Sequence, residues 1–297
     1  MIPSPGVVDL VTAGEAFDDV VFSGLARLPR EGEELKTNGF ARSPGGGVII
    51  TAIAAARLGL QCAALTGVGR DAARLLRVEG VRLRNLKRRG EPVAVSVALS
   101  THRDRCFVTF NGMNESLPTR IRASLAEIRA RHVHFALHPA RCAPWIAVID
   151  SLRRRGTTTS WDFGWNPGLP RDPHFRTLAT SVDYLFLNRN EAVAYARART
   201  MARALRLWRG APRCIVVKLG ARGSRLVGAG IDIRAAATRV DAVDTTGAGD
   251  AFNAGFLVAR LRGRDLQAAL RLANRVGALS TRRAGGIAAL PRPREVS

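Results

Sequence analysis

The sequence predicts an α/β fold in which helices cover a mostly parallel sheet and a small β-sheet lid lies beside it. Short apolar runs of strand length alternate with longer helical patterns, which is typical of βαβ units. Two β-rich excursions without a helix, at approximately 20–39 and 93–112, interrupt this alternation. A chain of 297 residues with 46% apolar content can bury one large core. We therefore expect a single domain over residues 1–297.

Six apolar runs have the length and composition of strands. They are Val7–Ala13, Cys62–Thr66, His132–Leu137, Thr158–Phe163, Tyr184–Leu187 and Cys214–Leu219. Longer stretches between and after them have helical apolar spacing. They are Ile49–Leu58, Pro144–Arg154, Glu191–Trp208, Ala251–Leu261 and Leu266–Arg282. The first of these helices reads IITAIAAARLG, and Gly59 is its expected C-terminal stop.

The second β-rich excursion contains a hairpin signal. Val93–Leu99 alternates apolar and small residues, a polar THRDR turn follows, and then a second strand CFVTF. Arg105 and Phe107 lie in this hairpin, where a lid could contact a substrate. A plain hairpin with one exposed charge is the alternative interpretation.

The formal net charge of +22 raises the question of a nucleic-acid partner. The only lysines are Lys36, Lys87 and Lys218, so arginine supplies 43 of the 46 basic residues. These arginines are spread along the chain, and no aromatic-interleaved basic run accompanies them. We therefore expect no specific nucleic-acid partner, although the charge favours anionic substrates and non-specific binding of polyanions.

The four cysteines and the apolar runs bear on location. Cys62, Cys106, Cys142 and Cys214 form no CxxC pair, so free thiols are expected. No apolar run approaches the ~20 residues of a membrane span, and the first residues do not resemble a signal peptide. We expect a cytoplasmic protein without membrane association.

Two histidines, His132 and His134, fall on one face of a predicted strand, and His138 follows closely. Histidine is a frequent metal ligand, but no carboxylate or cysteine at suitable spacing completes a tetrahedral set. We expect structural or substrate-proximal histidines.

The segment with the most chemical information is Asp244–Phe256, which reads DTTGAGDAFNAGF. A glycine-rich turn that leads into a helix exposes backbone N–H groups beside the positive end of the helix dipole, which favours anions. Asp250 next to such a site could accept the proton of a hydroxyl during phosphoryl transfer. From local chemistry alone, the alternative that Asp250 only caps the helix stays open.

Several segments, taken together, resemble the PfkB (ribokinase-like) carbohydrate kinases in their order along the chain. The segment at Asp244–Phe256 resembles the second signature of that family, and Gly45–Gly59 resembles the first. Other similar segments are GEAFDD at Gly14–Asp19, NRNE at Asn188–Glu191, KLGARG at Lys218–Gly223, LAN at Leu272–Asn274 and the terminal GG-x-x-AL-P run. The resemblance implies a three-layer α/β/α domain with a mostly parallel central sheet and a β lid that often mediates dimers.

The resemblance also implies roles for individual residues, with ATP and Mg²⁺ as cofactors. Asp250 would be the catalytic base, beside an anion hole formed by the N–H groups of Gly247, Ala248 and Gly249. Asn188 and Glu191 would organise Mg²⁺, with Glu191 acting through water. The residues that would line the nucleotide are Lys218, Gly220, Gly223 and Asn274.

On the substrate side, the resemblance assigns Asp19, Gly45 and Gly46 to the binding of the acceptor. Asp244 and Thr246 match the loop in which family members hold a monovalent cation such as K⁺. Two places depart from the pattern. Ile50 stands where family members often carry Asn, and the segment 162–168 has Gly164 and Trp165 in place of the DxNxR residues.

These observations predict an ATP-dependent phosphotransferase that phosphorylates a hydroxyl of a sugar or sugar acid, similar to fructokinases and ketodeoxy-sugar-acid kinases. A homodimer formed through the lid is also implied. A nucleoside kinase of the same fold is an alternative, with Ile50 and Phe107 as an apolar wall for a base. A second alternative is a regulatory homologue that binds nucleotide or sugar without turnover.

Overall fold

Nine strands form the main sheet within residues 7–101 and 105–296, the part of the chain that this computed structural model describes. The order of the strands across the sheet is β13-β12-β11-β10-β9-β8-β1-β4-β5. Their bounds are β1 Val8–Gly14, β4 Cys62–Thr66, β5 Arg82–Asn85, β8 Ala130–Ala136, β9 Thr158–Asp162, β10 Tyr184–Asn188, β11 Cys214–Lys218, β12 Ser224–Gly228 and β13 Ile231–Ala235.

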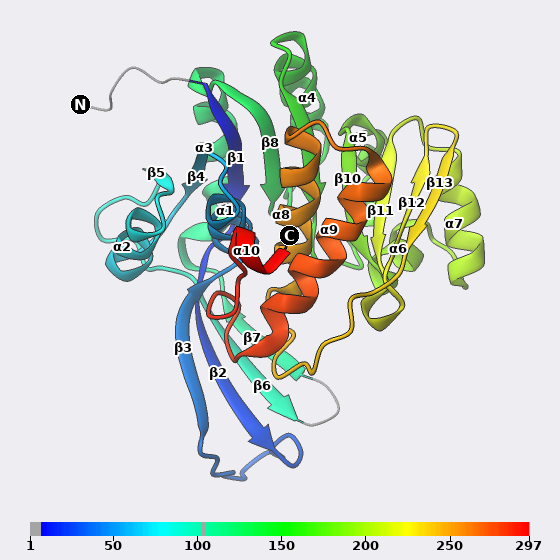
Figure 1. The fold of residues 1–297 in the computed structure, drawn as a ribbon. Coiled ribbons are helices and arrows are strands. Elements are labelled where there is room, and N and C mark those ends of the chain that lie inside the picture. Colours follow the sequence, from blue (N-terminus) through cyan, green and yellow to red (C-terminus); the bar gives the residue numbers. More distant parts are fainter. Residues whose placement is uncertain (1–6, 102–104, 297) are drawn as a thin grey trace.

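The strands from β5 to β11 pair in parallel, whereas β11, β12 and β13 pair antiparallel. The predicted strands are all present, and the hairpin β12–β13 was not anticipated from the sequence. The carboxyl ends of the parallel strands point towards the smaller sheet, as the arrowheads of β1 and β8 show (Figure 1). Ligands of open α/β sheets bind at this edge.

Helices cover both faces of the sheet. Leu10, Phe186 and Val216 point to the face that packs against α1 Gly47–Arg57, α2 Arg70–Val78, α8 Ala248–Leu261 and α9 Leu266–Leu279. Alternate residues such as Val11 and Phe135 point to the other face. That face packs against α3 Leu117–Ser124, α4 Ala143–Arg154, α5 Phe175–Ser181, α6 Arg189–Tyr195 and α7 Met201–Arg209. Strands buried on both faces in this way form the expected three-layer arrangement.

The remaining helical segments are short. Helix α10 Pro293–Val296 packs against α9. Turns of 3₁₀ helix occupy Gly112–Glu115, Leu125–Glu127, Leu169–Arg171, Gly220–Arg222 and Ser280–Arg282.

An aromatic cluster holds the carboxyl ends of β8 and β9 together. The rings of Phe135 and Trp161 stack with their centroids 4.6 Å apart, and Trp145 meets Trp161 edge-on at 4.9 Å. The indole N–H of Trp161 donates to the carbonyl of Leu137 at 3.0 Å. Such pairs contribute ~0.5–1.5 kcal/mol beyond the area they bury. They fix the backbone from which Asp162 projects on the opposite face of β9.

The smaller sheet has the order β3-β2-β6-β7 and lies beyond the carboxyl edge of the main sheet (Figure 1). Its strands are β2 Phe17–Leu25, β3 Gly39–Gly45, β6 Val95–Thr101 and β7 Arg105–Phe110. Strand β2 therefore begins before residue 20, and β3 extends beyond residue 39. Residues 102–104, which belong to the predicted THRDR turn, and the side chain of Arg105 lie outside the described residues.

One predicted helix is wrong. The stretch Glu191–Trp208 forms two helices, α6 and α7, instead of one. Between them Arg197 adopts a positive φ of 49°, and the Thr200 side chain accepts from the Arg203 N–H at 3.3 Å and caps α7. Threonine at an N-cap supplies the acceptor that a new helix needs, so it starts α7.

Candidate active site

Two helix N-termini meet at the carboxyl edge of the main sheet. Helix α1 begins after Gly46 and α8 begins after Gly247, and neither cap residue has a side chain to satisfy the first N–H groups. The two ends are close, because a Cβ added at Gly47 would lie 3.0 Å from Oδ1 of Asp250. The first N–H groups of the two helices and their two positive dipole ends make this place favourable for an oxyanion.

The predicted anion hole, Gly247 to Gly249, is the turn and first residues of α8. Gly247 has a φ of 71°, in the left-handed region that favours glycine. A Cβ added there would lie 2.7 Å from Cδ1 of Ile50, and one added at Gly286 would meet the same atom at 2.7 Å. Ile50 is only 2% exposed, and its side chain packs beneath the backbone of Gly247 and Gly286, inside the protein. It does not form an apolar wall of the cleft, as the nucleoside-kinase alternative had assumed.

Asp250 lies in the first turn of α8. Burial, and then the negative charge of Asp162, raise its pKa from 3.8 to about 7, against the opposing effect of Lys218. A carboxyl with this pKa is poised to take and release a proton near neutral pH. Its backbone carbonyl accepts from the Thr51 hydroxyl at 3.2 Å, which joins α8 to α1.

Lys218, Asp162 and Asn253 form a buried polar cluster beside this turn. The Lys218 ammonium lies 2.6 Å from Oδ2 of Asp162, and the Asn253 amide donates to the same oxygen at 2.8 Å. Burial opposes ionisation of Asp162, but the Lys218 charge and the two hydrogen bonds outweigh it and lower the pKa of Asp162. A Cβ added at Gly249 would lie 3.1 Å from Nζ of Lys218, so the ammonium lies against the anion hole.

Asn188 and Glu191 form a capping box at the start of α6. The Asn188 side chain accepts from the Glu191 N–H at 2.9 Å, and Glu191 accepts from the Asn188 N–H at 2.7 Å. Glu191 is 4% exposed, and burial, followed by the charge of Asp162, raises its pKa. The hydrogen bonds of Glu191 are thus those of a plain helix cap. The negative charge of Asp250 also contributes to its raised pKa.

A cavity of about 610 Å³ adjoins the anion hole. The four residues predicted to line a nucleotide, Lys218, Gly220, Gly223 and Asn274, all line it, together with Ala248 and Gly249. The Asn274 amide donates to the carbonyls of Ala235 and Ala236, at 3.2 and 2.8 Å. Asn274 therefore also holds the cavity wall in place.

Asp19 lies on β2, which is a strand of the smaller sheet. A Cβ added at Gly45 would lie 1.8 Å from Oδ2 of Asp19, so only glycine leaves room for this carboxylate. Burial, and then the charge of Asp250, raise the pKa of Asp19 to about 7. Gly45, Gly46 and Asp19 are thus brought together near Asp250, and an acceptor site formed by them stays a prediction.

Asp244 and Thr246 stabilise the loop before α8. Oδ1 of Asp244 accepts from the Thr246 N–H at 2.8 Å and hydroxyl at 2.7 Å, and Oδ2 accepts from the Gly285 N–H at 2.8 Å. The carboxylate therefore joins two loops around the anion hole. A monovalent cation at this loop stays a prediction.

Two residues at this edge, Asn253 and Glu15, were not predicted, whereas His138 was expected to be structural or substrate-proximal. Asn253 stands one helical turn after Asp250, a spacing that could have identified it. Glu15 and His138 follow the ends of β1 and β8, where polar residues often reach a site. The Glu15 carboxylate accepts from the His138 N–H at 3.3 Å, and burial raises its pKa to about 7. Nδ1 of His138 is buried without a hydrogen-bond partner among the described residues.

His132 and His134 are structural. Both are buried and both bond to the Ser160 hydroxyl at 2.8 Å. Burial lowers the pKa of His132 to about 3 and of His134 to about 4, so both stay neutral. In the described part of the chain, no three His, Cys, Asp or Glu side chains are placed to hold a metal ion by themselves. The four cysteines are free thiols, as expected.

Comparison with known proteins agrees with this geometry. The profile of the pfkB family carbohydrate kinases matches residues 9–293. The chain belongs to this family. It is 29% identical over 299 residues to the ribokinase of Bacillus subtilis, covering 97% of this chain and 98% of the relative. It is 28% identical to the probable fructokinase-4 of Arabidopsis thaliana, with 87% of each chain covered.

Solved structures show the same fold. The adenosine kinase of Sinorhizobium meliloti superposes with a TM-score of 0.80 at 24% identity, over 95% of this chain and 96% of that one. The ribokinase of Arabidopsis thaliana, complexed with ribose and ATP, superposes with a TM-score of 0.77 at 23% identity, over 98% of each. This pfkB-family chain therefore has the ribokinase-like fold. None of its helices within the described residues is long and apolar enough to span a bilayer.

Proposed function

We propose that the protein transfers the γ-phosphoryl group of ATP to a hydroxyl of a sugar or sugar acid, with Asp250 as the base. The observation that carries this proposal is the position of Asp250 between two unlike sites. On one side, Ala248 and Gly249 line the cavity of about 610 Å³. On the other side, the Asp19 carboxylate lies against Gly45, the last residue of β3. A donor and an acceptor would thus meet at the first turn of α8.

The cavity suits a nucleotide in shape and chemistry. Its lining includes the apolar side chains of Val240 and Phe252, against which a purine ring can pack. At its inner end are the anion hole and the Lys218 ammonium, which are suited to phosphate oxygens. The relatives and the ribokinase complexed with ATP support ATP as the donor.

Side chains and backbone groups of this chain would carry out the individual parts of the phosphoryl transfer. An acceptor hydroxyl bonded to Asp19 would have its proton within reach of Asp250, which is poised to accept it near pH 7. The N–H groups of Gly247 to Gly249, at the positive end of the α8 dipole, would stabilise charge on the transferring phosphoryl group. Lys218, held by Asp162, would add a positive charge against Gly249.

A Mg²⁺ ion would offset the negative charge of the carboxylates at this edge of the sheet. The carboxylates of Asp162, Glu191 and Asp250 act on one another, and Lys218 is the cation that offsets them. Burial, and then the charge of Asp162, raise the pKa of Glu191 and Asp250, and a bound cation would offset the part due to charge. Asn188 and Glu191 would hold Mg²⁺ through water, and the ion would neutralise phosphate charge.

The smaller sheet offers a surface for closure or association. Phe40 and Phe110 are 63% and 56% exposed on β3 and β7. A lid over the acceptor would exclude water and limit hydrolysis of ATP. A homodimer through this sheet is part of the proposal, and size-exclusion chromatography with light scattering would measure it.

The experiment that tests the proposal is a screen of sugars, sugar acids and nucleosides for acceptor-dependent release of ADP with Mg²⁺. Turnover with a sugar or sugar acid, lost by ~10²–10⁴-fold in Asp250→Asn, is the expected result. Turnover with a nucleoside alone would identify a nucleoside kinase, for which exposed Phe107 on β7 could supply an apolar contact.

Absence of turnover must be distinguished from absence of binding. ATP binding without turnover on any acceptor would favour a regulatory homologue and overturn the proposal. Undiminished turnover in Asp250→Asn would leave the kinase activity but remove Asp250 as its base. An RNA-induced thermal shift that disappears at higher salt would report only non-specific charge binding.

A further inference from the structure

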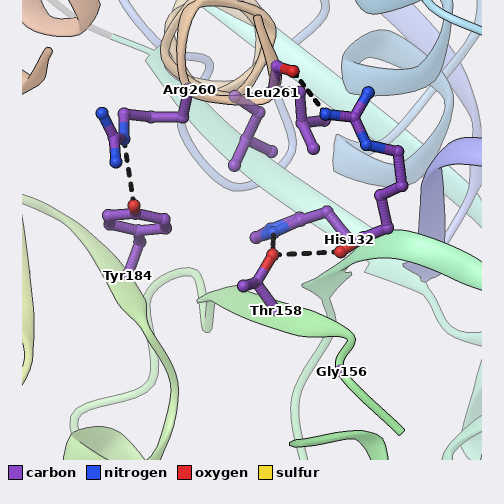
Figure 2. Close-up of a pocket in the computed structure, with 8 residues that line it drawn as sticks. His132, Gly156, Thr158, Tyr184, Arg260 and Leu261 are labelled. Atoms are coloured by element: carbon purple, nitrogen blue, oxygen red, sulfur yellow. Dashed lines mark hydrogen bonds between the residues drawn. The ribbon is translucent and has the colours of Figure 1, made fainter. Parts of the chain in front are cut away.

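A second cavity, of about 330 Å³, opens at the opposite edge of the main sheet (Figure 2). Its floor is formed by the first residues of the parallel strands, among them His132 of β8, Thr158 of β9 and Tyr184 of β10. Its roof is the last turn of α8, with Arg260 and Leu261. Asp250 and Arg260 are ten residues apart on α8, which corresponds to about 15 Å along the helix. The cavity is therefore separate from the candidate active site.

The charged groups around this cavity are mainly cationic. Arg260 has no carboxylate within ion-pair distance in the described part of the chain. Its Nε donates to the Tyr184 hydroxyl at 3.1 Å, and a second nitrogen donates to the carbonyl of Arg264. Arg131 is paired with Asp9 at 2.9 Å. One of the two guanidinium groups therefore keeps an unbalanced positive charge.

The carbonyl groups at the end of α8 are already bonded within the protein. The carbonyl of Leu261, at the end of the helix, already accepts from Nη2 of Arg131 at 2.6 Å. The Val258 carbonyl accepts from the Arg262 N–H at 3.1 Å. With these carbonyls satisfied inside the protein, the groups left to meet a ligand are predominantly donors.

The hydroxyl of Tyr184 is one of these donors. Its oxygen accepts from Arg260, and its own proton has no acceptor among the described residues. The ring is held edge-on against Phe256, with centroids 5.0 Å apart, so the hydroxyl is fixed in place. A guanidinium and a phenol that converge on one cavity match the acceptor oxygens of a carboxylate or phosphate.

The floor is polar, neutral and rigid. His132 is 1% exposed, and its ring nitrogens bond to Thr158 and Ser160, each at 2.8 Å. Its pKa of about 3 keeps it uncharged, so it neither adds to nor offsets the arginine charge. Leu257 and Leu261 supply an apolar wall opposite. A ligand would thus have an oxyanion at the Arg260 end and a short apolar part against the leucines.

We propose that this cavity binds a small oxyanion, a carboxylate or phosphate group on a compact and partly apolar skeleton. The site is independent of phosphoryl transfer, and none of its residues has a part in the proposed reaction. The groups that would bind the oxyanion are the Arg260 guanidinium and the Tyr184 hydroxyl.

Calorimetric titration with inorganic phosphate and, separately, with butyrate tests this site and distinguishes the two oxyanions. Because the anion hole can also take phosphate, the decisive comparison is between variants. Arg260→Met should weaken binding of at least one probe by tenfold or more, and should leave any site at the anion hole intact. The matched control is Arg206→Met, which removes one exposed positive charge on α7.

The proposal would be overturned if neither probe binds or if Arg260→Met binds both probes as tightly as the wild type. An equal loss of affinity in Arg206→Met would also overturn it, because it would show that the overall positive charge, and not this site, holds the anion. Tyr184→Phe keeps the ring and removes the hydroxyl donor. It therefore tests oxyanion binding at this cavity if Arg260→Met does not fold. We expect it to weaken binding severalfold, and unchanged affinity in this variant would also count against the site.

Discussion

The ammonium of Lys218 lies 2.6 Å from the carboxylate of Asp162, although the two residues are 56 positions apart in the chain. Their side chains are 14% and 11% exposed, so the pair is largely withdrawn from water. The same ammonium lies against Gly249 of the anion hole. This pair therefore connects the stability of the sheet edge to the electrostatics of the candidate active site.

Removing Lys218 should affect both properties. We expect Lys218→Met to lower the free energy of unfolding by ~3–5 kcal/mol, because an unpaired carboxylate is left buried. Urea denaturation measures this change. The double variant Lys218→Met/Asp162→Asn should recover much of the stability but none of the phosphoryl transfer. Arg153→Met, which breaks an exposed pair with Asp150, should lower the free energy of unfolding by less than ~1 kcal/mol.

The activity should depend on pH through Asp250. A base must be ionised to accept a proton, and the pKa of Asp250 is raised to about 7. We expect kcat/KM to rise about tenfold per pH unit below that value and to level off above it. Asp250→Asn should lack this limb in its residual activity. A flat wild-type profile from about pH 5.5 to 8 would point to another proton acceptor.

The free energy of unfolding should fall as Asp250 ionises, whereas the activity should rise. Because its folded pKa of about 7 exceeds its ordinary value of 3.8, the folded state binds more protons between these values. The stabilisation from Asp250 is thus complete below about pH 4 and is lost as the pH rises to about 7. At pH 8, Asp250→Asn should be more stable than the wild type by ~1–2 kcal/mol, since it removes a buried charge. A less stable variant at pH 8 would contradict this sign.

The contact between Ile50 and Gly247 predicts a non-additive pair of substitutions. Gly247→Ala should destabilise the fold and reduce turnover, because its φ of 71° is unfavourable and its Cβ would lie 2.7 Å from Cδ1 of Ile50. Ile50→Val removes that methyl group at a cost of ~0.5–1.5 kcal/mol. In the Ile50→Val background, Gly247→Ala should therefore lower the free energy of unfolding less than it does alone. Strict additivity by thermal denaturation would contradict this contact.

Ser160 should be a stability residue without a role in turnover. Its hydroxyl bonds to both His132 and His134 at 2.8 Å. Ser160→Ala should lower the free energy of unfolding by ~1–3 kcal/mol for each imidazole nitrogen left unsatisfied, with KM little changed. The control is Ser181→Ala, whose hydroxyl bonds only to the carbonyl of Leu178. Equal losses in the two variants would contradict the structural role of the histidines.

The segment Asp244–Phe256 shows how much of the site could be predicted. Its glycines and small residues predicted a turn into a helix, and the structure places the N-cap at Gly247 and Asp250 in the first turn. This was possible because turn and cap preferences act over a few neighbouring residues. The break before α7 is equally local, because the Thr200 side chain caps the helix, but apolar spacing does not reveal a cap.

The role of Ile50 could not be predicted, because residues 50 and 247 meet only when α1 and α8 pack together. The same is true of Asp162, the first residue of the segment 162–168 that departs from the family pattern. Its carboxylate reaches Lys218 because β9 and β11 both pair in parallel with β10, so their ends reach one edge.

Hydrophobic periodicity and local turn chemistry were thus sufficient to predict the α/β fold, its lid and the glycine turn with its aspartate. They act within one element, where spacing along the chain corresponds to spacing in the molecule. The partners of Lys218, the position of Ile50 and the cavity beneath Arg260 required the folded chain. Each depends on the register of paired strands and on helix packing, which bring together residues that no sequence spacing relates.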